Sequence, residues 1–192
     1  MRTTTGQSGQ SGQSSRRTGG WQSYHLRADA VRGVLARLDG SLSSPGSLAL
    51  PWDDALASVF LDPDDLLEAL HGVWTRRLLA RVDLELETGT GTPRQSVETA
   101  WRATRTQLPA LRTLLDRYAD TDVAQRCVTG EHRLLAVAAG LATLSDPAPR
   151  SAGRGAELVA SLQQKRTPTR HRRTHTQRLS RLLGCRHGFA AA

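Results

Sequence analysis

Apolar side chains recur at three- and four-residue spacing along most of the chain between Trp21 and Leu144, with polar residues between them. This spacing places the apolar residues on one face of each helix. No useful stretch alternates apolar and polar residues with period two, and β-branched residues are sparse. We therefore predict an all-α fold, an irregular bundle of four or five helices over residues 21–145.

Capping signals divide this region into helices. Asp62 is a suitable N-cap, and Pro63 suits the first helical position. Thr92 and Gln95 have the spacing of a capping box. Pro109 lacks a backbone N–H and is predicted to kink the helix that Thr92 begins. The predicted helices cover about 24–38, a short segment opened by Pro51, 62–87, 92–118 and 122–144.

Four tryptophans lie on or beside the apolar stripes. Large aromatic side chains at such positions usually anchor a core. We expect this role for all four, with an aromatic ligand cage as the alternative: Trp21, Trp52, Trp74 and Trp101.

The segments outside this helical region have a different composition. Residues 1–20 repeat Gly-Gln-Ser and are predicted to form a disordered, flexible tail, while residues 40–50 and 145–153 are typical of linkers. Residues 146–192 are predicted to form a linker and a basic, partly helical C-terminal arm. Two short amphipathic helices are expected there, and the first is a candidate to dock back on the bundle: Leu158, Val159 and Leu162, then Leu179, Leu182 and Leu183.

The 192 residues carry 26 Lys+Arg and 18 Asp+Glu, a formal net charge of +8. Lys165 is the only lysine, and the absence of Ile and Asn indicates a GC-rich genome rather than arginine-specific chemistry. The placement of charge is more informative than its type. Residues 21–149 carry 13 cations and 17 anions, whereas residues 150–192 carry 10 cations and Glu157 alone.

Cations crowded in this way attract a polyanion, and a nucleic-acid backbone is the most abundant one. No base-reading motif is present, so we expect binding to nucleic acid, possibly RNA, without strong sequence specificity. An acidic protein surface, a membrane surface, and the chain's own acidic stretch over residues 53–68 are alternative partners. The helical bundle itself is a possible surface for a protein partner. The residues expected to contact phosphate are Lys165, Arg166, Arg170, Arg172, Arg173, Arg178 and Arg181.

Two groups of residues have spacings found at metal sites. The C-terminal arm carries four His and Cys residues of the types that bind zinc. The second pair, Cys185 and His187, is closer in sequence than the ligands of a zinc knuckle, and the surrounding arginines disfavour a cation. Glu68-x-x-His71 has the spacing of carboxylate di-iron bundles, but the chain has no second such pair. We therefore expect no metal and no cofactor. The weak zinc candidates are His171, His175, Cys185 and His187.

Arg126 and His132 have a spacing that resembles the catalytic pair of the helical HEPN ribonucleases, which would imply cleavage of an RNA backbone. The resemblance covers these two residues, and Cys127 follows the arginine where that family usually has a polar residue. One such pair is expected by chance in a chain with this many arginines, and we do not assign the chain to that family. A non-enzymatic protein is the leading hypothesis, and a helical hydrolase or nuclease using His71 or His132 is an alternative.

The cellular location is also constrained by the sequence. No apolar run approaches the roughly 18 residues of a membrane span, and Met1 to Gly20 lack the apolar region of a signal peptide. Cys127 and Cys185 are far apart and do not form a disulfide framework. We expect a cytoplasmic protein without integral membrane insertion.

Overall fold

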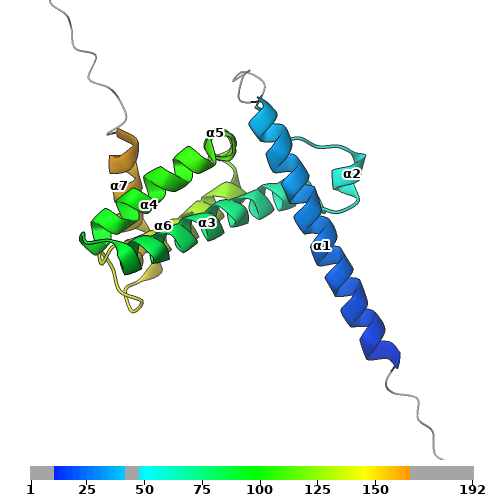
Figure 1. Ribbon diagram of the computed structural model, residues 1–192, viewed down its shortest axis with the longest axis horizontal. Helices are drawn as coiled ribbons and strands as arrows, with labels where there is room; N and C mark the ends of the chain where they lie inside the picture. The colour runs from blue at the N-terminus through cyan, green and yellow to red at the C-terminus, as the bar shows by residue number, and fades with distance from the viewer. Residues whose placement is uncertain (1–10, 42–47, 165–192) are drawn as a thin grey trace, which may run out of the picture.

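The computed structural model describes residues 11–41 and 48–164, the first ten of them as backbone only. The described residues form seven helices and no strand (Figure 1), which confirms the all-α prediction. The helices are α1 (Ser11–Gly40), α2 (Asp54–Ala57), α3 (Pro63–Thr88), α4 (Pro93–Gln107), α5 (Pro109–Arg117), α6 (Asp122–Ala138) and α7 (Ala148–Gln164).

The predicted caps set the beginnings of α3 and α4. The Asp62 carboxylate accepts a hydrogen bond from the Asp65 N–H at 2.8 Å, and Pro63 is the first residue of α3. Thr92 and Gln95 form both hydrogen bonds of a capping box at the start of α4. These contacts satisfy backbone donors that have no partner inside the helix.

Pro109 does more than kink a helix, because it separates α4 from α5. Leu108 lies between the two helices with φ −125° and ψ 56°, outside the helical region. Proline disfavours a helical conformation in the residue before it and fits well at the first position of a new helix. The predicted helix over 92–118 is therefore two helices, and the described part of the region over 21–145 holds six helices instead of the four or five predicted.

One hydrophobic core contains side chains of all seven described helices, including Val34 and Leu38 of α1, and α7 packs mainly against α6 (Figure 1). Trp74 and Trp101 are its largest buried side chains. Trp21 and Trp52 are 66% and 39% exposed, so the expectation that all four tryptophans anchor the core is wrong for these two. A stripe on one helix buries a side chain only where another element covers it, and the N-terminal turns of α1 extend beyond the other helices (Figure 1).

Helix α7 begins at Ala148, inside the segment predicted to be a linker. Two of the small residues that suggest a linker, Ser151 and Ala152, are buried, as is Gly155 just beyond the predicted linker. Small side chains at these positions allow the helix to pack closely. The docking of the amphipathic segment is confirmed: Leu158, Val159 and Leu162 belong to the common core.

Helix α1 begins at Ser11, within the segment over residues 1–20 that is predicted to be flexible. Extending a helix that already exists adds one hydrogen bond for each residue fixed and needs no buried side chain, whereas starting one is costly. The apolar pattern beginning at Trp21 therefore locates the part of α1 that can pack, but not its first residue. Residues 1–10 lie outside the described residues.

The expected linker over residues 40–50 ends in contacts with α5. Leu48 is 2% exposed and belongs to the core. The Leu50 N–H donates to the Tyr118 hydroxyl at 3.1 Å, and Arg117 donates to the Leu48 carbonyl at 3.1 Å. These bonds fix the chain as it approaches α2.

Candidate binding groove between α1 and α3

Two ion pairs attach α1 to the segment that begins α2 and α3. Arg27 of α1 donates to both carboxylate oxygens of Asp65, at 2.8 and 2.7 Å. Arg37, three turns further along α1, donates to Asp53 at 2.8 Å. The bidentate geometry of the first pair fixes direction as well as distance. Part of the acidic stretch over residues 53–68 therefore holds α1 in place.

The Arg27–Asp65 pair is reinforced on both sides. The Arg27 guanidinium holds the pKa of the Asp65 carboxyl below its usual value, and Asp65 raises the pKa of Arg27. The Leu61 N–H donates to Asp65 at 3.0 Å. The guanidinium also lies 4.5 Å from the centre of the Phe60 ring, a favourable cation–π position.

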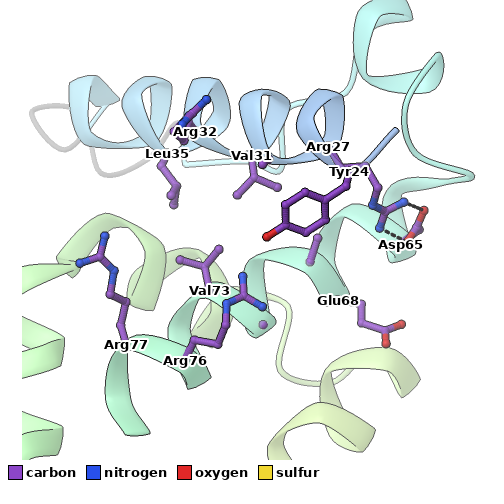
Figure 2. Close-up of a pocket in the computed structure, with 13 residues that line it drawn as sticks. Tyr24, Arg27, Val31, Arg32, Leu35, Asp65, Glu68, Val73, Arg76 and Arg77 are labelled. Atoms are coloured by element: carbon purple, nitrogen blue, oxygen red, sulfur yellow. Dashed lines mark hydrogen bonds and ion pairs between the residues drawn. The ribbon is translucent and has the colours of Figure 1, made fainter. Parts of the chain in front are cut away.

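A groove of about 790 Å³ lies where α1 passes over α3 (Figure 2). Its floor is apolar and comes from both helices, with Gly72 adding no side chain to it. The apolar residues that line the groove are Ala28, Val31 and Leu35 of α1 and Ala69 and Val73 of α3.

Charged side chains line this groove along its length (Figure 2). Glu68 lies near the Arg27–Asp65 pair at one end, Arg76 lies near the middle, and Arg77 lies toward the other end. Both of these arginines are exposed, and neither makes an ion pair within the described part of the chain. Arg32, across the groove on α1, is paired with Asp29 of its own helix. The groove therefore offers two uncompensated guanidinium groups beside an apolar floor.

An exposed aromatic cluster extends the apolar floor along α1. Trp21 and Tyr24 are 66% and 67% exposed, and Trp21 stacks on His25 with ring centroids 5.2 Å apart. Tyr24 also lines the groove. Because Trp21, Tyr24, Ala28 and Val31 are three or four residues apart, they form one stripe that continues from the groove beyond the bundle.

A second polar cluster lies inside the core. His71 is 1% exposed and Glu131 is 4% exposed. Among the residues that the structure describes, neither ring nitrogen of His71 has a hydrogen-bond partner, and neither has the Glu131 Oε2 atom. Arg112, which donates to Asp116 at 2.6 Å, lies 5.1 Å from the centre of the Trp74 ring.

Burial dominates the acid–base behaviour of this cluster. It lowers the pKa of His71 to about 4, and the positive charge of Arg112 acts in the same direction. Burial raises the pKa of Glu131, while the Trp74 indole N–H and Arg112 act to lower it. His71 is therefore neutral at pH 7, and the low exposure of both groups keeps a dissolved substrate away from them.

The two spacings that suggested chemistry do not form sites in the structure. Glu68 is exposed and lines the groove, whereas His71 is buried and does not line it. Arg126 lines a shallow depression on α6 whose lining does not include His132. His132 is partly buried, and burial together with Arg112 lowers its pKa.

The predicted phosphate contacts and zinc candidates lie outside the described residues. They are Lys165, Arg166, Arg170, Arg172, Arg173, Arg178 and Arg181, and His171, His175, Cys185 and His187. Within the described ranges, no group of three or more His, Cys, Asp or Glu side chains could hold a metal ion. In that same part of the chain, no helix is long and apolar enough to cross a membrane.

The apolar stripe on α1 is predictable from the sequence, whereas the groove is not. The adjacent cations Arg76 and Arg77 on an otherwise amphipathic helix are the signal that could have pointed to it. The chain matches no protein-family model, no curated protein and no solved structure.

Proposed function

We propose that this chain is a non-enzymatic helical interaction protein whose basic C-terminal arm binds nucleic acid or a ribonucleoprotein without strong sequence specificity. The observation that carries this proposal is the segregation of charge along the sequence. Residues 150–192 hold 10 cations and one carboxylate, whereas residues 21–149 hold 13 cations and 17 carboxylates.

A dense row of cations binds phosphate because association releases condensed counterions, and the gain depends on salt. The contacts would come from Lys165, Arg166, Arg170, Arg172, Arg173, Arg178 and Arg181. Arginine forms bidentate hydrogen bonds with phosphate, and the interleaved threonines and histidines add donors. RNA and DNA share this phosphate backbone, so we expect the arm to bind both.

Intramolecular neutralisation of the arm is the competing explanation, and the contacts of the acidic stretch weigh against it. Asp53 is paired with Arg37, Asp65 is paired with Arg27, and Asp62 caps α3. Half of the six carboxylates that could receive the arm therefore already have partners within the fold. An external polyanion is favoured for this reason.

A protein–protein regulatory or adaptor module, with the arm neutralised by an acidic partner, is the second candidate. The open α1–α3 groove is the observation that favours it. A hydrolase or nuclease has no such support, because His71 is buried and His132 does not share a depression with Arg126. We also propose a cytoplasmic location, because two cysteines far apart in the sequence suit a reducing compartment.

The experiment compares the full chain with a variant in which the seven arm cations are replaced by glutamine. Fluorescence anisotropy with a labelled single-stranded RNA and a DNA duplex is measured over a range of salt concentrations. Removal of one phosphate-binding cation should reduce the salt slope for single-stranded RNA by about 0.7. The matched control replaces Arg76, Arg77, Arg126 and Arg133 on the helices by glutamine. Unchanged affinity and slope in the arm variant, or an equally weakened control, contradicts the proposal.

Binding of the arm to polyglutamate separates the two candidates. If polyglutamate binds as tightly as RNA at the same salt concentration, the adaptor function is favoured over the nucleic-acid function.

A further inference from the structure

We propose that the groove between α1 and α3 is a docking site for an acidic amphipathic helix of another protein. This inference goes beyond the proposed function, since it uses no cation of the C-terminal arm. It depends on the arrangement of side chains in the groove and on the exposed stripe that continues from it.

The apolar part of the site is longer than the groove. Val31 and Leu35 form the α1 side of the floor, Tyr24 lines the groove, and Trp21 continues the same stripe beyond it. Four side chains on one helical face over about four turns match the length of a helix laid along a groove. Exposed aromatic side chains supply large contact areas and are enriched at protein interfaces.

Gly72 allows a close approach at the centre of the floor. A Cβ atom at this position would lie 3.2 Å from the Arg76 Nη1 atom, and no backbone atom outside its own helix lies within 4 Å. The surface there is limited by the α3 backbone and by one movable arginine. A partner helix can therefore lie closer to α3 at Gly72 than a larger residue would permit.

Charge selects the partner. Four arginines and two carboxylates line the groove. Arg27 is neutralised by Asp65 and Arg32 by Asp29, which leaves Arg76, Arg77 and the carboxylate of Glu68 without ion-pair partners in the described part of the protein. Two unpaired cations against one unpaired anion leave the groove positive, and both cations lie away from the Arg27–Asp65 pair (Figure 2). Two carboxylates on the flank of a docked helix would pair with these guanidinium groups at the edge of an apolar contact.

The same charges disfavour the two occupants that this chain could supply. The C-terminal arm, with 10 cations after residue 149, would bring like charge toward Arg76 and Arg77. A second copy would most readily offer its own exposed α1 stripe between Trp21 and Leu35, where the one carboxylate, Asp29, is already paired with Arg32. The stripe therefore brings no free carboxylate to Arg76 and Arg77. An acidic segment of a different protein is the occupant that the groove fits.

The probe is a fluorescein-labelled synthetic helix of about 18 residues, roughly five turns. It carries leucines at i, i+3, i+7 and i+10 and glutamates on both flanks. A matched peptide has lysine at every glutamate position. We expect saturable binding of the acidic peptide to the full chain by fluorescence anisotropy, and binding of the lysine peptide that is at least about tenfold weaker, because two ion pairs become repulsive.

Two pairs of variants locate the binding. Arg76→Glu with Arg77→Glu should weaken the acidic peptide about tenfold, whereas Arg150→Glu, an exposed arginine of α7, should leave it unchanged. Trp21→Ser with Tyr24→Ser should also weaken binding, whereas Leu144→Ser, 77% exposed and away from the groove, should not. Circular dichroism of each variant establishes that it is folded.

The inference is wrong if the acidic peptide shows no saturable binding or if the lysine peptide binds with equal affinity. It is also wrong if the control variants weaken binding of the acidic peptide as much as the groove variants do. Light scattering that shows a dimer dissociated by the Trp21/Tyr24 variant assigns the groove to a second copy instead. RNA affinity is measured on the Arg76/Arg77 variant as well. It should be unchanged, so failure of the groove and failure of the arm are separate results.

Discussion

Gly155 of α7 lies directly against the backbone carbonyl of His132 in α6. A Cβ atom at this position would overlap the His132 carbonyl oxygen and carbon. The contact belongs to the most extensive helix–helix interface of the described residues, that between α6 and α7. Backbone atoms cannot move aside as a flexible side chain can, so the two helices approach this closely only with glycine at residue 155.

Gly155→Ala should therefore destabilise the protein even though alanine has the higher helix propensity. The two helices must separate, and we expect a decrease of about 2–3 kcal/mol in the free energy of unfolding, as for other overpacked sites. Urea denaturation followed by circular dichroism measures this decrease.

Gly153→Ala is the matched control. Gly153 lies on the same helix and is exposed, and a Cβ atom added there would have no neighbouring atom within 4 Å. This substitution should stabilise the protein by up to about 1 kcal/mol through helix propensity. Destabilisation at both positions would mean that α7 requires glycine for a reason other than its contact with α6.

Glu131→Gln should stabilise the protein at neutral pH. Burial raises the pKa of Glu131, and Asp116 acts in the same direction, so the folded state favours the neutral acid. The unfolded chain ionises near the ordinary value of 4.5. Above that pH the unfolded state is increasingly favoured, and the stability contributed by this group is lost as pH rises through the folded pKa. Glutamine keeps nearly the same shape without the charge.

The expected gain is on the order of 1 kcal/mol at pH 8 and vanishes near pH 4, where glutamic acid is neutral in both states. Thermal melting of both proteins between pH 4 and pH 8 measures it. A gain that is equal at the two ends of this range would show that the charge of Glu131 is not its cause.

The local features of the fold are predictable because each depends on a few neighbouring residues. Asp62 and Thr92 act as caps through side chains three residues from the N–H groups that they bind. Pro109 interrupts a helix through its own ring. Such contacts have the same geometry in any protein, so the sequence is sufficient to place them.

The features that the sequence does not predict depend on long-range packing. Ser151 lies in the predicted linker and Gly155 just beyond it, and only the contact of Gly155 with α6 shows why a helix there needs a small residue. The groove depends on the course of α1 over α3, which is held by the Arg27–Asp65 pair, 38 residues apart, and by Val34 and Leu38 in the core. No periodicity within α1 or α3 contains that information. The same holds for Trp21, whose exposure depends on where the bundle ends.

Asp65→Asn should loosen α1. It removes the charge from a bidentate pair whose side chains are 39% and 27% exposed, so solvent screening limits the expected destabilisation to about 1 kcal/mol. Hydrogen–deuterium exchange should be faster in α1 from residue 27 onward and unchanged in α6. Asp64→Asn changes the neighbouring, exposed carboxylate of the same helical turn and is the matched control. Equal effects of the two substitutions would show that the helix dipole, and not Arg27, is the partner that matters.

His71 should make the protein sensitive to mild acid. Its ordinary pKa is 6.5, and burial with the nearby Arg112 charge lowers it to about 4 in the folded state. As pH falls below 6.5 the unfolded chain takes up a proton that the folded protein resists, so stability declines until about pH 4. The largest contribution is about 3 kcal/mol, from 1.36 kcal/mol for each pKa unit.

Urea unfolding of the His71→Leu variant tests this effect, because leucine is buried without a titrating group. The variant should lose less stability than the natural sequence between pH 6.5 and pH 4. The expected slope is opposite in sign to that of Glu131, whose carboxyl favours the folded state more strongly as pH falls, so the two effects can be separated in one pH series. His25, exposed on α1, is the control, and His25→Leu should keep the natural slope. If His71→Leu keeps it too, the acid sensitivity originates elsewhere, and His132, whose pKa burial also lowers, is the next group to replace.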